Sequence, residues 1–150
     1  MTGHSPFELL LVDDDTDDCL FFREALDELP VDANLTIVGD GVELMDLLSS
    51  AKTKFPHAIY LDLNMPRKNG FECLVEMKKN ERLRHLPVFI YSTSINSDMV
   101  ELVYKSGASH YIRKPAEFQA LKAVILASIR LIPGITATQT PKESFIVNSK

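Results

Sequence analysis

Aspartates crowd into a short stretch that follows an apolar run near the start of this 150-residue chain. Residues 9–20 are LLLVDDDTDDCL, with five aspartates among the six positions 13–18. Adjacent carboxylates repel one another, and each raises the cost of ionising the next. Such a cluster is either solvated on the surface or held together by a cation, and residues elsewhere in the chain must decide between the two.

A calcium-binding loop is one chemistry that the acidic stretch suggests. The first, third, fifth and twelfth positions of an EF-hand pattern are occupied by Asp13, Asp15, Asp17 and Glu24. The sixth position requires glycine for its sharp turn, and here it is Asp18. The preceding FELLLV is also typical of a strand, whereas an EF-hand needs a helix there. We therefore interpret this match as a consequence of acid density.

The elements that must position these acids alternate along the chain. Short apolar runs typical of buried strands lie at 7–13, 35–41, 58–63, 87–92 and 109–115. Segments with helical periodicity lie at 17–29, 42–48, 71–80, 98–107 and 117–132. Five strands alternating with five helices predict an α/β protein with a doubly wound, five-stranded parallel sheet that is covered on both faces.

Ligands of such sheets bind beyond the carboxyl ends of the strands. The polar residues predicted at those ends are Asp13, Asp14 and Asp15 after the first strand, Asp62 after the third, Ser92 and Thr93 at the fourth, and Lys114 after the fifth. Acids, hydroxyls and a cation from four separate segments therefore converge on one edge of the sheet. A merely solvated acidic loop would not need that arrangement.

Four motifs carry a resemblance to a known family. LLLVDDD, YLDLNMPRKNGFE, PVFIYSTS and GASHYIRKP occur in the order typical of the receiver domain of two-component response regulators, which residues 7–132 resemble. The run STSIN is similar to stand-alone regulators that include cyanobacterial phytochrome partners. The resemblance implies a flavodoxin-like (βα)5 fold with strand order 2-1-3-4-5. It also implies a receiver domain over 1–132 and a tail over 133–150 without an output domain.

The resemblance assigns a role to each of several residues. Asp62 matches the aspartate that accepts a phosphoryl group from the phosphohistidine of a histidine kinase, and Lys114 matches the phosphate-binding lysine. Ser92 matches the switch hydroxyl, with Thr93 as the alternative if the strand register differs by one. Tyr111 matches the switch aromatic, for which a half-buried strand aromatic is the other interpretation.

The same resemblance implies a Mg²⁺ site. Asp13 and Asp14 match the acidic pair that binds the ion, and Asp62 and the backbone carbonyl of Asn64 complete the set. Mg²⁺ prefers oxygen ligands and retains waters, so this donor set suits it and would relieve the repulsion among the carboxylates. The remaining acids, Asp15, Asp17 and Asp18, are expected at the start of the following helix, where their charges interact favourably with the positive end of the helix dipole.

A phosphatase of the haloacid-dehalogenase type is the alternative function. That family also places D-x-D after a buried strand, with Asp13 as nucleophile and Asp15 as general acid. It normally has threonine or valine where this chain has Asp17, and it needs further acids late in the chain, where only two glutamates follow Lys114. We therefore predict a signalling domain that transfers a phosphoryl group only to its own aspartate and is not a metabolic enzyme.

Net charge and hydropathy indicate which kinds of partner and which cellular compartment to expect. A net charge of −5 argues against a nucleic-acid-binding surface. No apolar run approaches the roughly 20 residues of a membrane span, and no signal peptide is apparent, so we expect a cytoplasmic protein. Its two cysteines, Cys19 and Cys73, are then reduced core residues. The resemblance implies a sensor histidine kinase or a phosphotransfer protein as partner.

The fifth predicted helix carries more apolar residues than the core requires. Once its core face is filled, Ala123, Leu126, Ala127 and Leu131 remain. Large exposed apolar patches mark interfaces, so we predict a homodimer or partner surface on the fourth and fifth helices. The alternative is that the tail covers this helix with SFIV, residues 144–147.

Overall fold

A six-stranded parallel sheet forms the centre of the computed structural model, which describes residues 6–50, 54–135 and 139–148. The strands are β1 (Phe7–Val12), β2 (Ala33–Val38), β3 (Ala58–Leu61), β4 (Val88–Ser92), β5 (His110–Arg113) and β6 (Ile146–Val147). They lie in the order β2-β1-β3-β4-β5-β6, and every neighbouring pair is parallel. The predicted flavodoxin-like order of the first five strands is confirmed.

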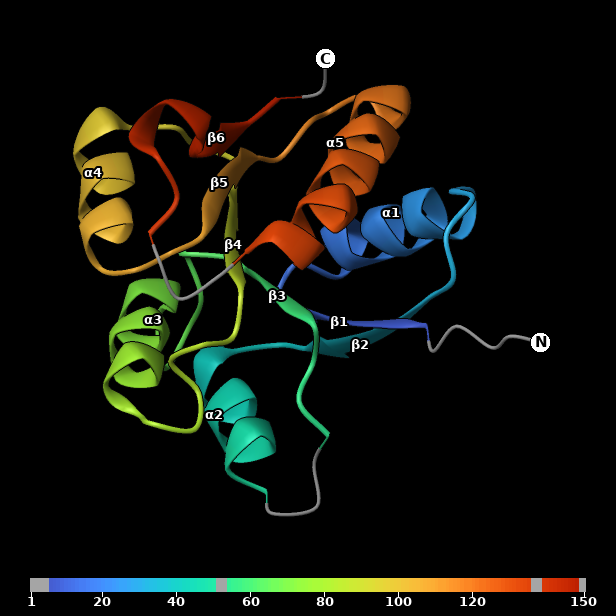
Figure 1. The fold of residues 1–150 in the computed structure, drawn as a ribbon. Helices are drawn as coiled ribbons and strands as arrows, with labels where there is room; N and C mark the ends of the chain where they lie inside the picture. Colours follow the sequence, from blue (N-terminus) through green and yellow to red (C-terminus); the bar gives the residue numbers. More distant parts are fainter. Residues whose placement is uncertain (1–5, 51–53, 136–138, 149–150) are drawn as a thin grey trace.

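Five helices cover the two faces of this sheet (Figure 1). They are α1 (Thr16–Asp27), α2 (Gly41–Ser49), α3 (Gly70–Lys79), α4 (Ser97–Lys105) and α5 (Phe118–Leu131). Helices α1 and α5 pack together on one face, and α2, α3 and α4 lie on the other. None of these helices in the described part of the chain is long and apolar enough to cross a lipid bilayer.

The strand β1 shows why its sequence is apolar without alternation. Leu10 and Val12 join the core beneath α2, α3 and α4, whereas Leu9 and Leu11 join the core beneath α1 and α5. Both sets are buried. A strand between two helical layers has no solvent face, so each of its positions favours an apolar residue.

Side-chain caps start the first four helices at the carboxyl edge of the sheet. Asp15, Asp40, Asn69 and Asn96 each accept hydrogen bonds from backbone N–H groups of the first turn. Such caps satisfy donors that would otherwise lack a partner at a helix start. The loops that lead from the strands into these helices are thereby held at the same edge as the predicted site.

The sixth strand is a difference from the five-stranded sheet that the sequence predicts. Ile146 and Val147 pair with Tyr111 and Ile112 of β5, and the preceding Phe145 is 1% exposed. Val147 contributes to the core on the α5 side and Phe145 to the core on the α4 side. Two paired residues are too few to show the alternation by which a strand is recognised in a sequence.

Candidate functional site

Strand pairing places two of the predicted aspartates side by side. Val12 of β1 pairs with Leu61 of β3, and the next residues of these strands are Asp13 and Asp62. The Asp62 N–H donates to the Val12 carbonyl at 3.0 Å, and the Asp13 N–H donates to the Val38 carbonyl at 3.1 Å. The backbone of both aspartates is therefore fixed by the sheet, and both residues are buried.

Asp14 completes a cluster of three carboxylates with these two residues. One oxygen from each of Asp13, Asp14 and Asp62 lies within 4.8 Å of the others, and Asp14 is exposed while its partners are buried. Burial raises the pKa of Asp62 to about 6; the charge of Lys114 opposes this rise and that of Asp13 adds to it. Three carboxylates at this spacing are a donor set for a hard divalent cation.

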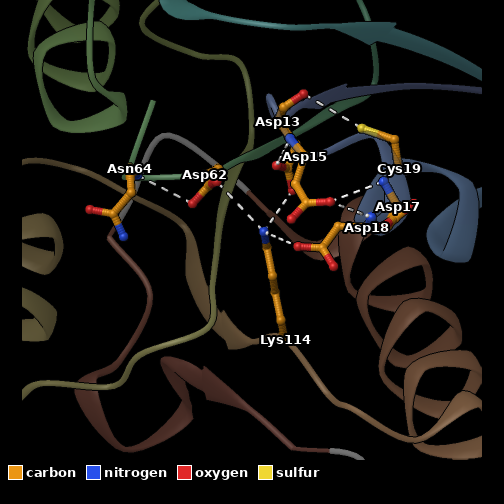
Figure 2. A network of polar contacts seen from close by, with 8 residues as sticks. All are labelled: Asp13, Asp15, Asp17, Asp18, Cys19, Asp62, Asn64 and Lys114. Atoms are coloured by element: carbon orange, nitrogen blue, oxygen red, sulfur yellow. Dashed lines mark hydrogen bonds and ion pairs between the residues drawn. The ribbon is translucent and has the colours of Figure 1, made fainter. Parts of the chain in front are cut away.

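Asn64 follows the cluster in the loop after β3. Its backbone N–H donates to Oδ1 of Asp62 at 3.3 Å (Figure 2). This hydrogen bond favours the ionised carboxylate and partly offsets the effect of burial on the Asp62 pKa. The loop backbone thus contacts the carboxylate that the sequence identifies as the acceptor.

Lys114 reaches into the carboxylate cluster from the end of β5, as Figure 2 shows. Its Nζ lies 2.7 Å from Asp13, 2.9 Å from Asp18 and 3.5 Å from Asp62, in each case measured to Oδ2. Burial alone lowers the pKa of this ammonium, but the hydrogen bonds to Asp13 and Asp18 outweigh it and the net pKa is raised. The side chain, which is 7% exposed, is therefore a permanently charged group.

Asp18 is a member of the site that the sequence interpretation missed. Asp15 and Asp17 occupy the expected helix-start positions, because Asp15 caps α1 by accepting the N–H groups of Asp17 and Asp18 (Figure 2). The Asp18 side chain, however, forms an ion pair with Lys114, 96 positions away. No local spacing signals a contact over that distance.

Ser92 and Thr93 occupy different environments at the end of β4. Ser92 is fully buried and Thr93 is exposed. The Oγ of Ser92 has no hydrogen-bond partner among the residues that the structure describes. A buried hydroxyl without a partner costs about 1–3 kcal/mol, which is offset when an oxygen acceptor arrives.

Tyr111 lies inside the molecule on β5. The residue is fully buried, and its hydroxyl donates to the carbonyl of Ser94 at 2.7 Å. Ser94 belongs to the loop that joins Ser92 to α4. The predicted switch aromatic is therefore in direct contact with the segment that follows the predicted switch hydroxyl.

Gly70, the first residue of α3, and Arg67 of the loop before it position the backbone around Asp62, the predicted acceptor. A Cβ at Gly70 would lie 2.1 Å from the carbonyl oxygen of Asp62, so only glycine allows this approach. Arg67, with φ of 64°, forms an ion pair with Asp40 through Nε at 2.9 Å and its terminal nitrogen at 2.5 Å. The loop is thus tied to the start of α2.

The fold and the polar edge define a class of protein. The model of the response regulator receiver domain matches residues 9–126, and the chain belongs to this family. The family assignment confirms the resemblance seen in the sequence. It establishes response regulator function in two-component signalling and does not support the haloacid-dehalogenase alternative.

Within the response regulators, the chain is similar to cyanobacterial phytochrome response regulators. The chain is 34% identical over 123 residues to the response regulator Rcp1 of Synechocystis sp., covering 79% of this chain and 84% of Rcp1. Among solved structures, it resembles the phosphorylated cyanobacterial phytochrome response regulator RcpA, with a TM-score of 0.79 and 32% identity over 86% of this chain and 95% of RcpA. The Mn²⁺-bound form of Rcp1 is also similar, with a TM-score of 0.73 and 30% identity over 91% and 99% of the two chains.

Proposed function

We propose that this chain is a cytoplasmic phosphoacceptor switch in which Asp62 takes a phosphoryl group from a sensor histidine kinase or a phosphotransfer protein. The observation that carries the proposal is the buried Asp62 carboxylate, which shares a cluster with Asp13 and Asp14 and lies 3.5 Å from the Lys114 ammonium. Asp62, the nucleophile, therefore lies beside two acids that can bind a metal ion. It also lies beside Lys114, whose positive charge can bind a phosphoryl oxygen. The family of the chain supports the same assignment.

The donor set fits Mg²⁺. Asp13, Asp14, Asp62 and the backbone carbonyl of Asn64 would hold the ion, and the Mn²⁺-bound form of Rcp1 supports a divalent cation in a relative. When bound, the ion neutralises the carboxylates and stabilises charge on the phosphoryl oxygens. Three carboxylates pair with Lys114, and Asp14 adds a fourth to the cluster beside them, so the site has an excess of negative charge that favours a further cation.

The transfer itself uses the carboxylate of Asp62 as nucleophile. A carboxylate oxygen bonds to phosphorus while the bond between phosphorus and the histidine nitrogen breaks, and the electron pair returns to the imidazole. Lys114 then pairs with one phosphoryl oxygen, and the unpartnered hydroxyl of Ser92 donates to another. The product is the modified chain, so the domain transfers phosphoryl to itself and is not a metabolic enzyme.

Labelling with acetyl phosphate and Mg²⁺ tests the acceptor. Intact-mass measurement should show one added phosphoryl group on the wild type and none on Asp62→Asn, which keeps the shape and removes the nucleophile. Asp17→Asn is the matched control, because Asp17 is exposed in the same acidic stretch, and it should be labelled as the wild type is. Full labelling of Asp62→Asn contradicts the assignment, and continuous hydrolysis that depends on Asp13 favours the phosphatase.

The output surface is proposed on α4 and α5, where phosphorylation would change a homodimer or partner contact. Leu102 of α4 is 41% exposed and Leu131 of α5 is 37% exposed, whereas Leu126 is half-buried. Sedimentation of the wild type and Leu126→Asp, with and without beryllofluoride as phosphoryl mimic, tests the homodimer. The buried charge should weaken association, and if both proteins stay monomeric throughout, the homodimer is wrong.

A further inference from the structure

The C-terminal segment, defined as residues 139–148, is bound to the edge of β5. The N–H of Tyr111 donates to the carbonyl of Phe145 at 3.0 Å, and β6 continues the pairing along β5. The Nδ1 of His110 lies 3.1 Å from the carbonyls of both Ser144 and Phe145. Main-chain pairing and a side-chain donor therefore both hold the segment.

The same segment also contacts α4, which lies beside it in Figure 1. The Tyr104 hydroxyl donates to the carbonyl of Thr140 at 2.8 Å, and its ring meets the Phe145 ring edge-on at 4.9 Å between centroids. Lys142 forms an ion pair with Glu101. Main-chain pairing and a side chain buried in a pocket are the contacts by which peptides bind to sheet edges, and the segment makes both.

Tyr111 connects this segment to the phosphoacceptor site. Its backbone N–H holds Phe145, and its hydroxyl holds the carbonyl of Ser94. Ser94 is two residues beyond Ser92, whose buried hydroxyl has no partner among the described residues. One residue therefore contacts both the C-terminal segment and the loop that is expected to move when a phosphoryl oxygen arrives.

We propose that the C-terminal segment is an internal ligand of the surface formed by α4 and β5, and that occupancy of the Asp62 site loosens it. The inference rests on the proposed function. A phosphoryl oxygen draws the Ser92 hydroxyl and its loop toward Asp62, which displaces the Ser94 carbonyl from the Tyr111 hydroxyl. Because a buried hydroxyl without a partner is unfavourable, Tyr111 shifts and weakens its hold on Phe145.

Loosening the segment would expose the part of the surface that Phe145 covers. Phe145 packs against Tyr104 of α4 and is itself almost fully buried, so its departure uncovers an aromatic site and the edge of β5. Such a surface fits an extended segment of a partner protein that carries an apolar side chain. By linkage, weakening the segment's attachment should in turn strengthen binding of the phosphoryl mimic.

Hydrogen exchange read by mass spectrometry tests this coupling in the full chain. Exchange is compared in Mg²⁺ with and without beryllofluoride, using a peptide around Asp62 to report occupancy and a peptide from the C-terminal segment to report attachment. We expect the Asp62 peptide to exchange more slowly and the C-terminal peptide to exchange about three- to tenfold faster, as loss of one buried hydrogen bond implies.

Two variants that each lack one tyrosine hydroxyl distinguish the coupling to the Asp62 site from the attachment of the C-terminal segment. Tyr111→Phe keeps the ring and the N–H bond to Phe145 but removes the bond to Ser94, so the segment should stay protected and its response to beryllofluoride should disappear. Tyr104→Phe removes the hydroxyl bond to Thr140, so the segment should exchange faster in both states and keep its response.

The outcomes distinguish the inference from the function on which it rests. A protected Asp62 peptide with unchanged or slower exchange of the C-terminal segment overturns the coupling and leaves the phosphoacceptor function standing. An unchanged response in Tyr111→Phe overturns the role of that hydroxyl. An Asp62 peptide that beryllofluoride does not protect contradicts the proposed function and the coupling with it.

Discussion

As the proposed nucleophile, Asp62 must meet two opposing demands. A nucleophile has to be ionised, yet this carboxylate is buried beside Asp13, and burial raises its pKa to about 6. Lys114 and the N–H of Asn64 favour the charged form. The residue is therefore mostly ionised at neutral pH while its charge still destabilises the fold, and a bound cation would relieve that strain.

Replacing Asp62 should stabilise the metal-free protein near neutral pH. The folded pKa of about 6 lies above the ordinary aspartate pKa of 3.8, so between these values the folded state binds more protons and the free energy of unfolding falls as pH rises. Asp62→Asn should thus be more stable than the wild type at pH 7.5 by about 1–3 kcal/mol, and the difference should shrink as pH falls toward 4. Urea unfolding in EDTA measures it.

The control for this experiment is Asp17→Asn. Asp17 is exposed and lies outside the carboxylate cluster, so its replacement should change the free energy of unfolding by less than about 0.5 kcal/mol. If Asp62→Asn were no more stable than the wild type at pH 7.5, the buried carboxylate would not be the source of destabilisation.

At the scale of elements, the loop between β3 and α3 contributes to the position of Asp62, the proposed acceptor. Asp40 caps α2 and also holds Arg67 of this loop. The N–H of Glu43 and then the Arg67 guanidinium keep the pKa of Asp40 below its usual value. One carboxylate therefore fixes the start of a helix and the position of the loop beside the site.

Gly70 should be intolerant of any side chain. The Cβ of Gly70→Ala would lie 2.1 Å from the Asp62 carbonyl oxygen, which is backbone and cannot move aside cheaply. We expect a loss of about 1–3 kcal/mol in the free energy of unfolding, as overpacking typically costs, together with slower labelling by acetyl phosphate. Gly134→Ala is the control, because its Cβ meets nothing within 4 Å. Equal labelling rates in the two variants would contradict this role.

At the scale of the whole molecule, the C-terminal segment is part of the core. Phe145 is 1% exposed, whereas the neighbouring Ile146 is 37% exposed. Phe145→Ala should lower the free energy of unfolding by about 3 kcal/mol, as removal of a buried phenylalanine does. Ile146→Ala should cost less than about 1 kcal/mol. Chemical denaturation of both variants compares them, and equal losses would mean that Phe145 is not anchored in the core.

The pattern of residues predicts most of the sheet and much of its polar edge. Apolar runs and helical periodicity are local signals, so the five predicted strands and five helices match those of the structure within a few residues. Since parallel strands end at one edge, the convergence of Asp13, Asp62 and Lys114 also follows from the order of elements. The sequence pattern predicts a feature correctly wherever that feature depends on the residues of a single strand or helix.

Tertiary packing decided what no local pattern encodes. The burial of Ser92 and exposure of Thr93 depend on how β4 sits between two helical layers, and the ion pair of Asp18 with Lys114 joins residues 96 positions apart. The short β6 pairs only because β5 offers an edge and the core has room for Phe145. Each of these features requires segments far apart in the chain to meet, and their meeting is a property of the packed sheet rather than of any one stretch of residues.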